Sequence, residues 1–303
     1  MGNNINSSKP VVSVVSSAIR PDNWMDIYNS VDEEKDFFEF FFVGPKKPNF
    51  DLPKNFFFLK SNVKPTQCWQ IAFEKCKGEF VIAIADDVVF KTHKPLKNLV
   101  NEWKKINDDK IGIGCKYQID GKSISDEEQK ILPGFDTPYS PAAFLIKKNM
   151  FLQLNGFEKK FIMGFWHSDF CIRLYNAGGK IFFSNVIIDE KKKLKSRGST
   201  LALDYWKEDR ATFNKIWMKE NPNIDPWGYE LLKKSAIDFT PFEKSNLLTI
   251  SQGPAGRWKY TNNVYSKIIV SENFFFIRKY FRILLKMSTS YKSFKYYLNK
   301  LFT

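Results

Sequence analysis

Two adjacent carboxylates stand at the end of an apolar run in the first third of the chain. The run is Phe80 to Ala85, and Asp86 and Asp87 follow it directly before apolar residues resume. Two acids packed together repel each other unless a cation or hydrogen-bond donors compensate them. A Mg²⁺ or Mn²⁺ ion held by one or two carboxylates and completed by substrate phosphates would do so. The alternative is a helix N-cap or a turn, where Asp is common, and the pair alone favours that alternative.

The elements around the pair predict a sheet that would place it at an edge. Strands are expected within 10–24, 36–45, 54–61, 79–90 and 110–117, with helices within 64–78 and 95–107. Gly78 is expected to end the first of these helices. The strands are nearly continuous in apolar residues and alternate with helices, which is typical of an α/β fold with a parallel sheet covered on both faces. In such sheets ligands bind beyond the carboxyl ends of the strands, where Asp86 and Asp87 would lie.

Composition indicates a globular protein with an anionic partner. The 303 residues are 43% hydrophobic and 17% aromatic, and 47 basic against 33 acidic residues give a net charge of +14. This charge suits a nucleotide, a nucleic acid or a membrane surface, although coding bias towards Lys would give the same surplus. Four scattered cysteines and two histidines make a structural zinc site improbable and predict free thiols in a reducing compartment.

The second half of the chain adds a further set of motifs. A strand is expected at Ala142–Ile146 and a short helix at Lys148–Leu154, followed by Gly156-Phe157 and a loop. A helix then begins near Ser168, a good N-cap residue, and Gly178-Gly179 ends it before another strand.

In this order the motifs resemble glycosyltransferase family 2, the inverting group with the GT-A fold. The residues concerned are "VSVVSSAIRPDNW", "KCKGEFVIAIADDVVF", "NGFEKKFIMGF" and "WHSDFCIRL", which together cover roughly residues 10–220. The resemblance implies transfer of a sugar from a nucleotide-sugar donor, with a divalent metal, Mn²⁺ or Mg²⁺, on the diphosphate. It also implies Asp87 as metal ligand and Asp86 as a ribose contact or supporting residue. Metal at this point would neutralise the leaving nucleoside diphosphate.

The resemblance implies further donor contacts in two loops. Ser16, Ser17 and Arg20 belong to the loop that should lie over the nucleotide. Arg20 could pair with phosphate, or it could be an ordinary surface arginine. Lys64 and Gln67 stand in a segment that resembles a nucleotide-binding loop only loosely. The second strand ends without the acid that usually reads the base, so the base is left open, with uridine as first choice.

The expected catalytic base is replaced in this chain. Where the family has a Glu-Asp pair, this sequence has Trp166 and His167, and the later acid and arginine are matched by Asp169 and Arg173. His167 could be the base, since imidazole has a suitable pKa. Asp169 could have taken the role, or the site could be impaired. Asp169 and Arg173 are also spaced i, i+4 and could simply pair on the helix.

Two remaining parts of the site are assigned from the same resemblance. The last strand ends near Asp189 and Glu190, either of which could complete the metal site, with Asp189 as first choice. Trp166 and Asp136 are candidates for the acceptor side, where the acceptor would be a glycan or lipid-linked hydroxyl. Trp166 could equally well be a buried core residue with no role in acceptor binding.

The C-terminal part differs from the rest. We expect a catalytic domain over residues 8–220 and a separate region over 221–303, whose last 32 residues form a basic amphipathic helix with seven basic residues and one acid. Such a helix could bind an anionic membrane surface, pack on the domain or bind a partner. With a polar N-terminus and no apolar run long enough to span a membrane, the protein is expected to be cytoplasmic, either free or peripheral on the inner face of a membrane.

Two other functions compete with the transferase. The chain could bind a sugar nucleotide or glycan without transfer, because the Glu-Asp pair is absent. The charge and the aromatic content could instead indicate a nucleic-acid-binding protein, which would show steeply salt-dependent binding. We consider nucleic acid an improbable partner, because the sequence has no helix-turn-helix, zinc-finger or aromatic RNA-binding pattern.

Overall fold

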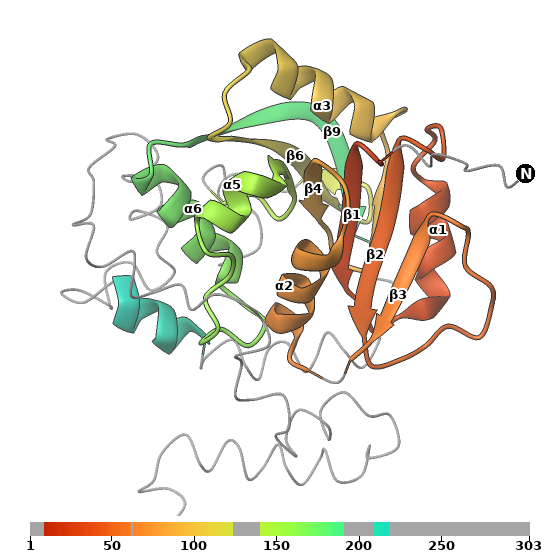
Figure 1. The fold of residues 1–303 in the computed structure, drawn as a ribbon, viewed down its shortest axis with the longest axis horizontal. Coiled ribbons are helices and arrows are strands. Elements are labelled where there is room, and N and C mark those ends of the chain that lie inside the picture. The colour runs from red at the N-terminus through yellow and green to blue at the C-terminus, as the bar shows by residue number, and fades with distance from the viewer. Residues whose placement is uncertain (1–8, 62, 124–139, 191–208, 218–303) are drawn as a thin grey trace, which may run out of the picture.

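A computed structural model describes residues 9–61, 63–123, 140–190 and 209–217 (Figure 1). Nine strands form one sheet: β1 (Val12–Ser17), β2 (Phe38–Gly44), β3 (Phe56–Lys60), β4 (Phe80–Ala83), β5 (Val88–Phe90), β6 (Ile111–Ile119), β7 (Lys122–Ser123), β8 (Phe144–Lys147) and β9 (Lys180–Glu190). The helical elements are η1 (Pro21–Asn23), α1 (Trp24–Asn29), α2 (Pro65–Lys75), α3 (Pro95–Ile106), α5 (Lys148–Gln153) and α6 (Trp166–Asn176). Residues 209–217 form one more helix.

The order of the strands creates a reversal point next to β1. The strands lie in the order β3-β2-β1-β4-β8-β6-β9-β5, with β7 paired to β6. Strands β3, β2, β1, β4, β6 and β9 run in one direction, and β8, β5 and β7 run in the other. From β1 the chain first adds β2 and β3 on one side and then β4 on the other. Such a switch point is where open α/β sheets bind their ligands, beyond the carboxyl ends of the two central strands.

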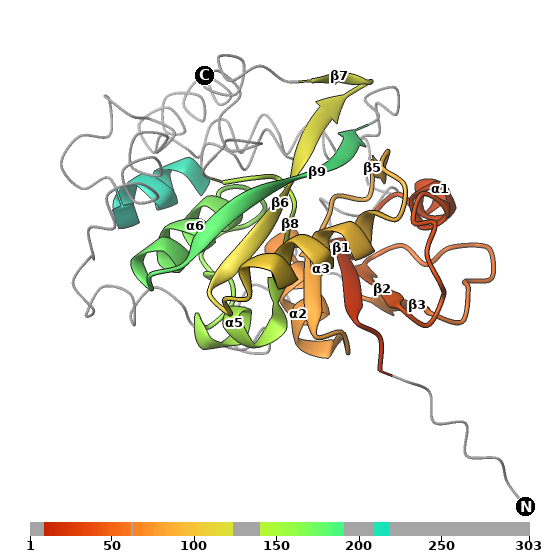
Figure 2. The ribbon, with the colours of Figure 1, turned by 90° about the horizontal axis from the view of Figure 1, so that it is seen from above.

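Helices cover both faces of the sheet, as expected for the α/β class (Figures 1 and 2). One buried cluster joins the sheet to α1 and α3, through residues such as Trp24 and Leu99. The other joins the opposite face to α2, α5, α6 and the helix at 209–217, through residues such as Phe73, Phe151 and Phe170. The prediction of an α/β fold with a mostly parallel sheet flanked by helices is therefore confirmed.

The apolar run before the acid pair is continuous because both faces of β4 are buried. Phe80 and Ile82 belong to the cluster under α1 and α3, whereas Val81 and Ala83 belong to the cluster under α2. Successive side chains of a strand point to opposite faces, so a strand between two helix layers must be apolar at every position. This explains why the chain turns polar only at the edge of the sheet, at Asp86.

Two helix boundaries differ by two or three residues from the expected ones. Helix α2 ends at Lys75, before Gly78. Gly78 is needed for another reason: its N–H donates to Ser13 Oγ at 2.8 Å, and a Cβ there would lie 2.6 Å from the Ser13 nitrogen. Helix α6 begins at Trp166, so Ser168 lies inside it and is buried beside Ser140 at 3.2 Å between the two hydroxyl oxygens. Differences of this size at a helix end are ordinary, but Ser168 lies inside the helix and is not its N-cap.

Further predictions concern the cysteines, membrane-spanning helices and the C-terminal region. All four cysteines are free and buried, as predicted. Among the described residues, no helix is long and apolar enough to cross a membrane. Asp136 and the whole region 221–303, including the basic amphipathic segment, lie outside the described residues, so the acceptor-side and membrane assignments made there stay predictions.

Candidate functional site

The acid pair lies at the switch point between β1 and β4. Asp86 and Asp87 follow β4 in a turn that leads back into β5, and Arg20 follows β1 in the neighbouring loop. Strands β1 and β4 are parallel neighbours, with Val12 opposite Phe80 and Val15 opposite Ala83, so their carboxyl ends meet at the same edge. The fold therefore brings together residues about 66 positions apart in the sequence.

Asp86 binds the loop after β1. Its Oδ2 accepts the backbone N–H groups of Ile19 and Arg20, each at 2.6 Å, and its Oδ1 pairs with the Arg20 guanidinium. The side-chain amide of Asn23 donates to the Asp86 carbonyl at 3.1 Å. Asp86 is only 1% exposed. Its carboxylate is thus occupied by protein donors, which fits the supporting role better than direct ligand contact.

Asp87 is the more available of the two acids. Its side chain is 14% exposed, and its Oδ2 lies 3.3 Å from the Arg20 guanidinium. Burial raises the pKa of Asp87 to about 6; Arg20 opposes this rise, and the negative charges of Asp86 and Glu190 add to it. Burial of Arg20 disfavours its charge, but Asp86 and Asp87 outweigh burial, so the pKa of Arg20 is raised. Among the described residues, one arginine faces these three carboxylates, so negative charge is in surplus there.

The end of β9 supplies Glu190 to this cluster, with Asp189 on the other side of the strand. Strand β9 pairs antiparallel with β5, so Glu190 lies opposite Val88 and Asp189 opposite Val89. Asp189 accepts the Gly121 N–H at 2.9 Å and lies 3.4 Å from the Lys91 ammonium. Glu190 accepts a hydrogen bond from the Tyr117 hydroxyl, and its charge acts on Arg20 and Asp87. Adjacent residues of a strand face opposite ways, which is why only one of them joins the site.

The cluster suits a divalent cation whose coordination is completed by a ligand. Within the described part of the chain, no three metal-binding side chains come close enough to hold an ion by themselves. Mg²⁺ and Mn²⁺ are commonly held by one or two carboxylates together with substrate phosphates and water. Burial is the main cause of the raised pKa of Asp87, and the charges of Asp86 and Glu190 add to it; a bound cation would favour the charged form of this carboxylate.

The helix α6 places its polar residues in the core. Asp169 is fully buried: its Oδ2 accepts from Arg173 Nε at 3.0 Å and Nη2 at 2.9 Å, and its Oδ1 accepts from Trp217 Nε1 at 3.0 Å. Arg173 also donates to the carbonyl oxygens of Leu154 and Gly156, at 2.6 and 2.7 Å. Asp169 therefore has the structural pairing that its i, i+4 spacing with Arg173 allowed.

Trp166 and His167, the first two residues of α6, are also largely buried. Trp166 packs against Trp69 and edge-on against Phe157, with ring centroids 4.5 and 4.6 Å away, and its indole N–H donates to the Met163 carbonyl. Trp166 therefore lies in the core, which was the alternative to a role in acceptor binding. His167 is 7% exposed, with its ring 5.3 Å from that of Trp166.

The loop before α6 is fixed by an acid from a distant segment. The carboxylate of Asp209 accepts three successive backbone N–H groups, those of Ile162, Met163 and Gly164, at 2.7 to 2.8 Å. Burial raises the pKa of Asp209 to about 6, although the three N–H donors oppose the rise. Asp209 is not identified from the sequence, and Glu190 is ranked there behind Asp189. Asp209 is 45 residues from Gly164, and no local pattern announces the contact.

The remaining residues predicted to contact the nucleotide-sugar donor are buried or half-buried. Ser16 is fully buried in β1, and Lys64 and Gln67 are 5% and 2% exposed at the start of α2. The Lys64 ammonium donates to the Lys159 carbonyl at 2.7 Å. Ser17 is half-buried at the end of β1. The structure thus joins Arg20, Asp86 and Asp87 in one cluster, and its described hydrogen bonds link Lys64 to the loop at 159 instead.

Comparison with known proteins gives a likeness of fold. No protein-family model matches the chain, and no curated protein matches its sequence. Among solved structures the chain is similar to residues 1–349 of TarS from S. aureus, at 13% identity over 75% of this chain and 81% of that one, with a TM-score of 0.46. Against a longer TarS structure the TM-score is 0.48 at 13% identity, over 76% of this chain and 42% of that one.

Proposed function

We propose that this chain is an inverting glycosyltransferase that uses a nucleotide-sugar donor, with a uridine diphosphate-linked sugar as first choice. The observation that supports this proposal most is the position of Asp87 at the switch point between β1 and β4, where the described carboxylates outnumber the described cations. A ligand that brings both a cation and phosphate groups would satisfy this charge. The order of the motifs, which resembles glycosyltransferase family 2, points to the same chemistry.

The chain's own residues would divide the work of binding. Asp87 would hold a divalent cation, with Glu190 adding negative charge beside it, and Arg20 would meet the phosphate groups. Asp86 would keep the Arg20 loop in place through the two backbone N–H groups that it binds. A bound divalent cation would supply charge neutralisation for the leaving diphosphate. The acceptor hydroxyl would attack the anomeric carbon as a base removes its proton.

His167 is the better candidate for that base. Both oxygens of Asp169 are already taken by Arg173 and Trp217, so its use as a base would break a buried ion pair. Removing one partner from such a pair is costly. His167 keeps an ionisable group at the position where the family has its aspartate.

A sugar-nucleotide-binding protein without transferase activity is the second candidate. It is favoured by the burial of Trp166 in the core and by the structural pairing of Asp169, which together leave His167 alone at the expected position of the base. This candidate predicts the same donor binding at Asp87 and differs only in the absence of turnover.

Calorimetric titration tests the proposal directly. UDP, GDP and their common sugar conjugates would be titrated with and without Mn²⁺ into wild type, Asp87→Ala and the control Asp51→Ala. Asp51 is exposed in a loop away from the acid pair. We expect Mn²⁺-dependent binding of one nucleotide that is lost in Asp87→Ala and kept in Asp51→Ala. Turnover that is lost in His167→Ala would separate the transferase from the binding protein. No binding of any nucleotide with metal present would contradict both.

A further inference from the structure

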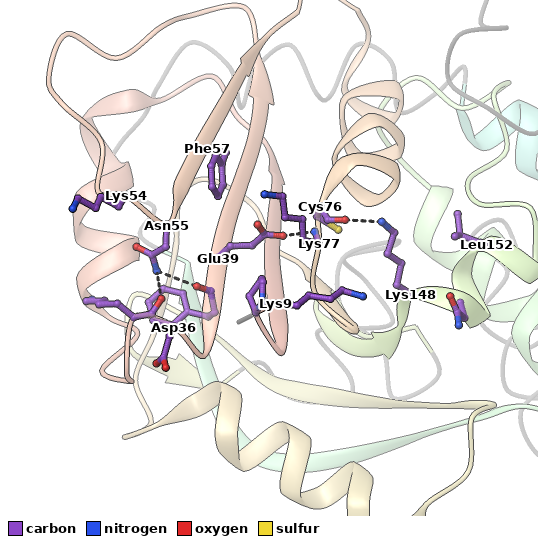
Figure 3. Close-up of a pocket in the computed structure, with 14 residues that line it drawn as sticks. Lys9, Asp36, Glu39, Lys54, Asn55, Phe57, Cys76, Lys77, Lys148 and Leu152 are labelled. Atoms are coloured by element: carbon purple, nitrogen blue, oxygen red, sulfur yellow. Dashed lines mark hydrogen bonds between the residues drawn. The ribbon is translucent and has the colours of Figure 1, made fainter. Parts of the chain in front are cut away.

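A hollow lies at the amino edge of the sheet, opposite the edge that carries the acid pair; Figure 3 shows the residues that line it. Its volume is about 650 Å³, within the range of small-molecule sites. It forms where the amino ends of β1, β2 and β3 meet the end of α2 and the start of α5, with Phe38 and Glu39 at the start of β2 and Lys148 at the start of α5 among its lining residues. Nothing in the proposed transferase reaction uses this hollow, so its role is a separate question.

The hollow is lined by an excess of positive charge. Two acids, Asp36 and Glu39, face five lysines: Lys9, Lys35, Lys54, Lys77 and Lys148. Among the described residues none of these five lysines makes an ion pair, whereas Lys91, Lys97, Lys105 and Lys147 elsewhere each do. Gathering ammonium groups without carboxylate partners costs electrostatic free energy that a bound anion would recover.

Hydrogen bonds hold the inner side of the hollow in place. Glu39 is 2% exposed, and its Oε1 accepts from the Ser13 hydroxyl at 2.6 Å and from the Lys77 N–H. The Lys148 ammonium donates to the carbonyl oxygens of Glu74 and Cys76, at 2.9 and 2.6 Å, as the dashed line to Cys76 shows in Figure 3. The backbone from which Lys77 extends is therefore positioned before any ligand arrives.

Exposed apolar side chains complete the wall. Phe57 is 38% exposed and Leu152 is 43% exposed, and both line the hollow. The Lys77 ammonium lies 5.6 Å from the centre of the Phe57 ring, and Figure 3 shows the two side chains approaching each other. The Phe57 ring is also stacked with Phe41, at 6.3 Å between centroids. A planar or apolar group could lie against Phe57 while an anionic group meets the lysines.

We propose that this hollow is a second binding site, for a small organic anion that carries more than one phosphate group. Lys9, Lys54 and Lys77 provide the ammonium groups, and Phe57 provides the surface for the organic part of the ligand. Lys35 and Lys148 are already engaged, Lys35 over the Tyr28 ring at 4.2 Å and Lys148 with the two carbonyl oxygens. The site lies at the amino edge of the sheet, so it does not depend on the function proposed for the carboxyl edge.

Calorimetry with two probes tests the proposal. Adenosine 5′-triphosphate and inorganic tripolyphosphate would be titrated in EDTA into the full chain carrying Asp87→Ala, so that no metal bound at Asp87 contributes. We expect both probes to bind, with the nucleotide tighter. In the triple variant Lys9→Gln, Lys54→Gln, Lys77→Gln the affinity should fall about tenfold, as expected for three exposed charge contacts. The control triple variant changes lysines that are exposed elsewhere: Lys47→Gln, Lys104→Gln, Lys122→Gln.

These measurements distinguish a specific binding site in the hollow from non-specific electrostatic attraction of anions to the basic protein. Equal weakening in both triple variants, or no binding to the parent chain at low salt, would overturn the proposal. Phe57→Ala should remove the preference for the nucleotide over tripolyphosphate; a preference that survives would overturn the assignment of Phe57. Lysine acetylation read by mass spectrometry gives an independent measurement: the nucleotide should protect Lys9, Lys54 and Lys77 and leave Lys104 unprotected. Uniform protection would also overturn the proposal.

Discussion

The acid cluster and the lysine-lined hollow lie at opposite edges of the mostly parallel sheet, carry opposite charge and hold it in opposite ways. At the carboxyl edge, Asp86 is buried, bound by backbone N–H groups and paired with Arg20. At the amino edge, lysines such as Lys9 and Lys54 are exposed and have no ion-pair partner among the described residues. Charge at the first edge is therefore part of the folded framework, whereas charge at the second edge is available to a ligand at little cost to folding. Changes at the two edges should differ accordingly.

Removal of Asp86 should have the largest effect. Asp86→Ala leaves the Arg20 guanidinium and the N–H groups of Ile19 and Arg20 without their acceptor. Breaking such a buried pair should lower the free energy of unfolding by about 3 kcal/mol. Chemical denaturation followed by circular dichroism would measure it, with Asp51→Ala as the matched exposed acid. A loss no larger than in Asp51→Ala would mean that the carboxyl edge is not part of the framework.

Neutralising Asp87 should have a smaller effect of opposite sign. The pKa of Asp87 is about 6 in the folded chain against an ordinary value of 3.8, so between these values the folded state binds more protons than the unfolded state. The charge of Asp87 therefore destabilises the metal-free chain above pH 6 and ceases to do so below pH 4. Asp87→Asn should raise the free energy of unfolding by about 2 kcal/mol at pH 7 and leave it unchanged at pH 4.

The same measurement has a clear failing outcome. Denaturation curves of wild type and Asp87→Asn would be recorded in EDTA at both pH values. A destabilised Asp87→Asn at pH 7 would mean that the contact between Asp87 and Arg20 outweighs the repulsion from Asp86 and Glu190. The edge would then lack the surplus charge on which the proposed cation site depends.

Changes at the amino edge should have the smallest effect on folding. Lys54 is exposed and has no ion pair among the described residues, so Lys54→Gln should alter the free energy of unfolding by less than about 0.5 kcal/mol. Glu39→Gln in the same hollow provides the contrast, because Glu39 is buried and bound to Ser13. If Lys54→Gln proves as destabilising as Asp86→Ala, the difference between the two edges disappears.

The sequence by itself determined the class of fold and the edge where the acids lie. The continuous apolar run from Phe80 predicts a strand covered on both faces, and a chain that turns polar at Asp86 has to be leaving the sheet there. Periodicity likewise predicts the helices that became α2, α3 and α5. These features depend on neighbouring residues alone, which is why local pattern reveals them.

Tertiary structure alone decided which of these residues work together. Whether Glu190 or Asp189 faces Asp87 depends on the register of β9 against β5, which no local pattern specifies. The burial of Asp169 depends on Trp217, 48 residues later, and the basic hollow gathers Lys9, Lys54, Lys77 and Lys148 from four separate segments. Contacts between distant segments arise from packing of the whole chain, so charge partners and pKa shifts become visible only in the folded structure.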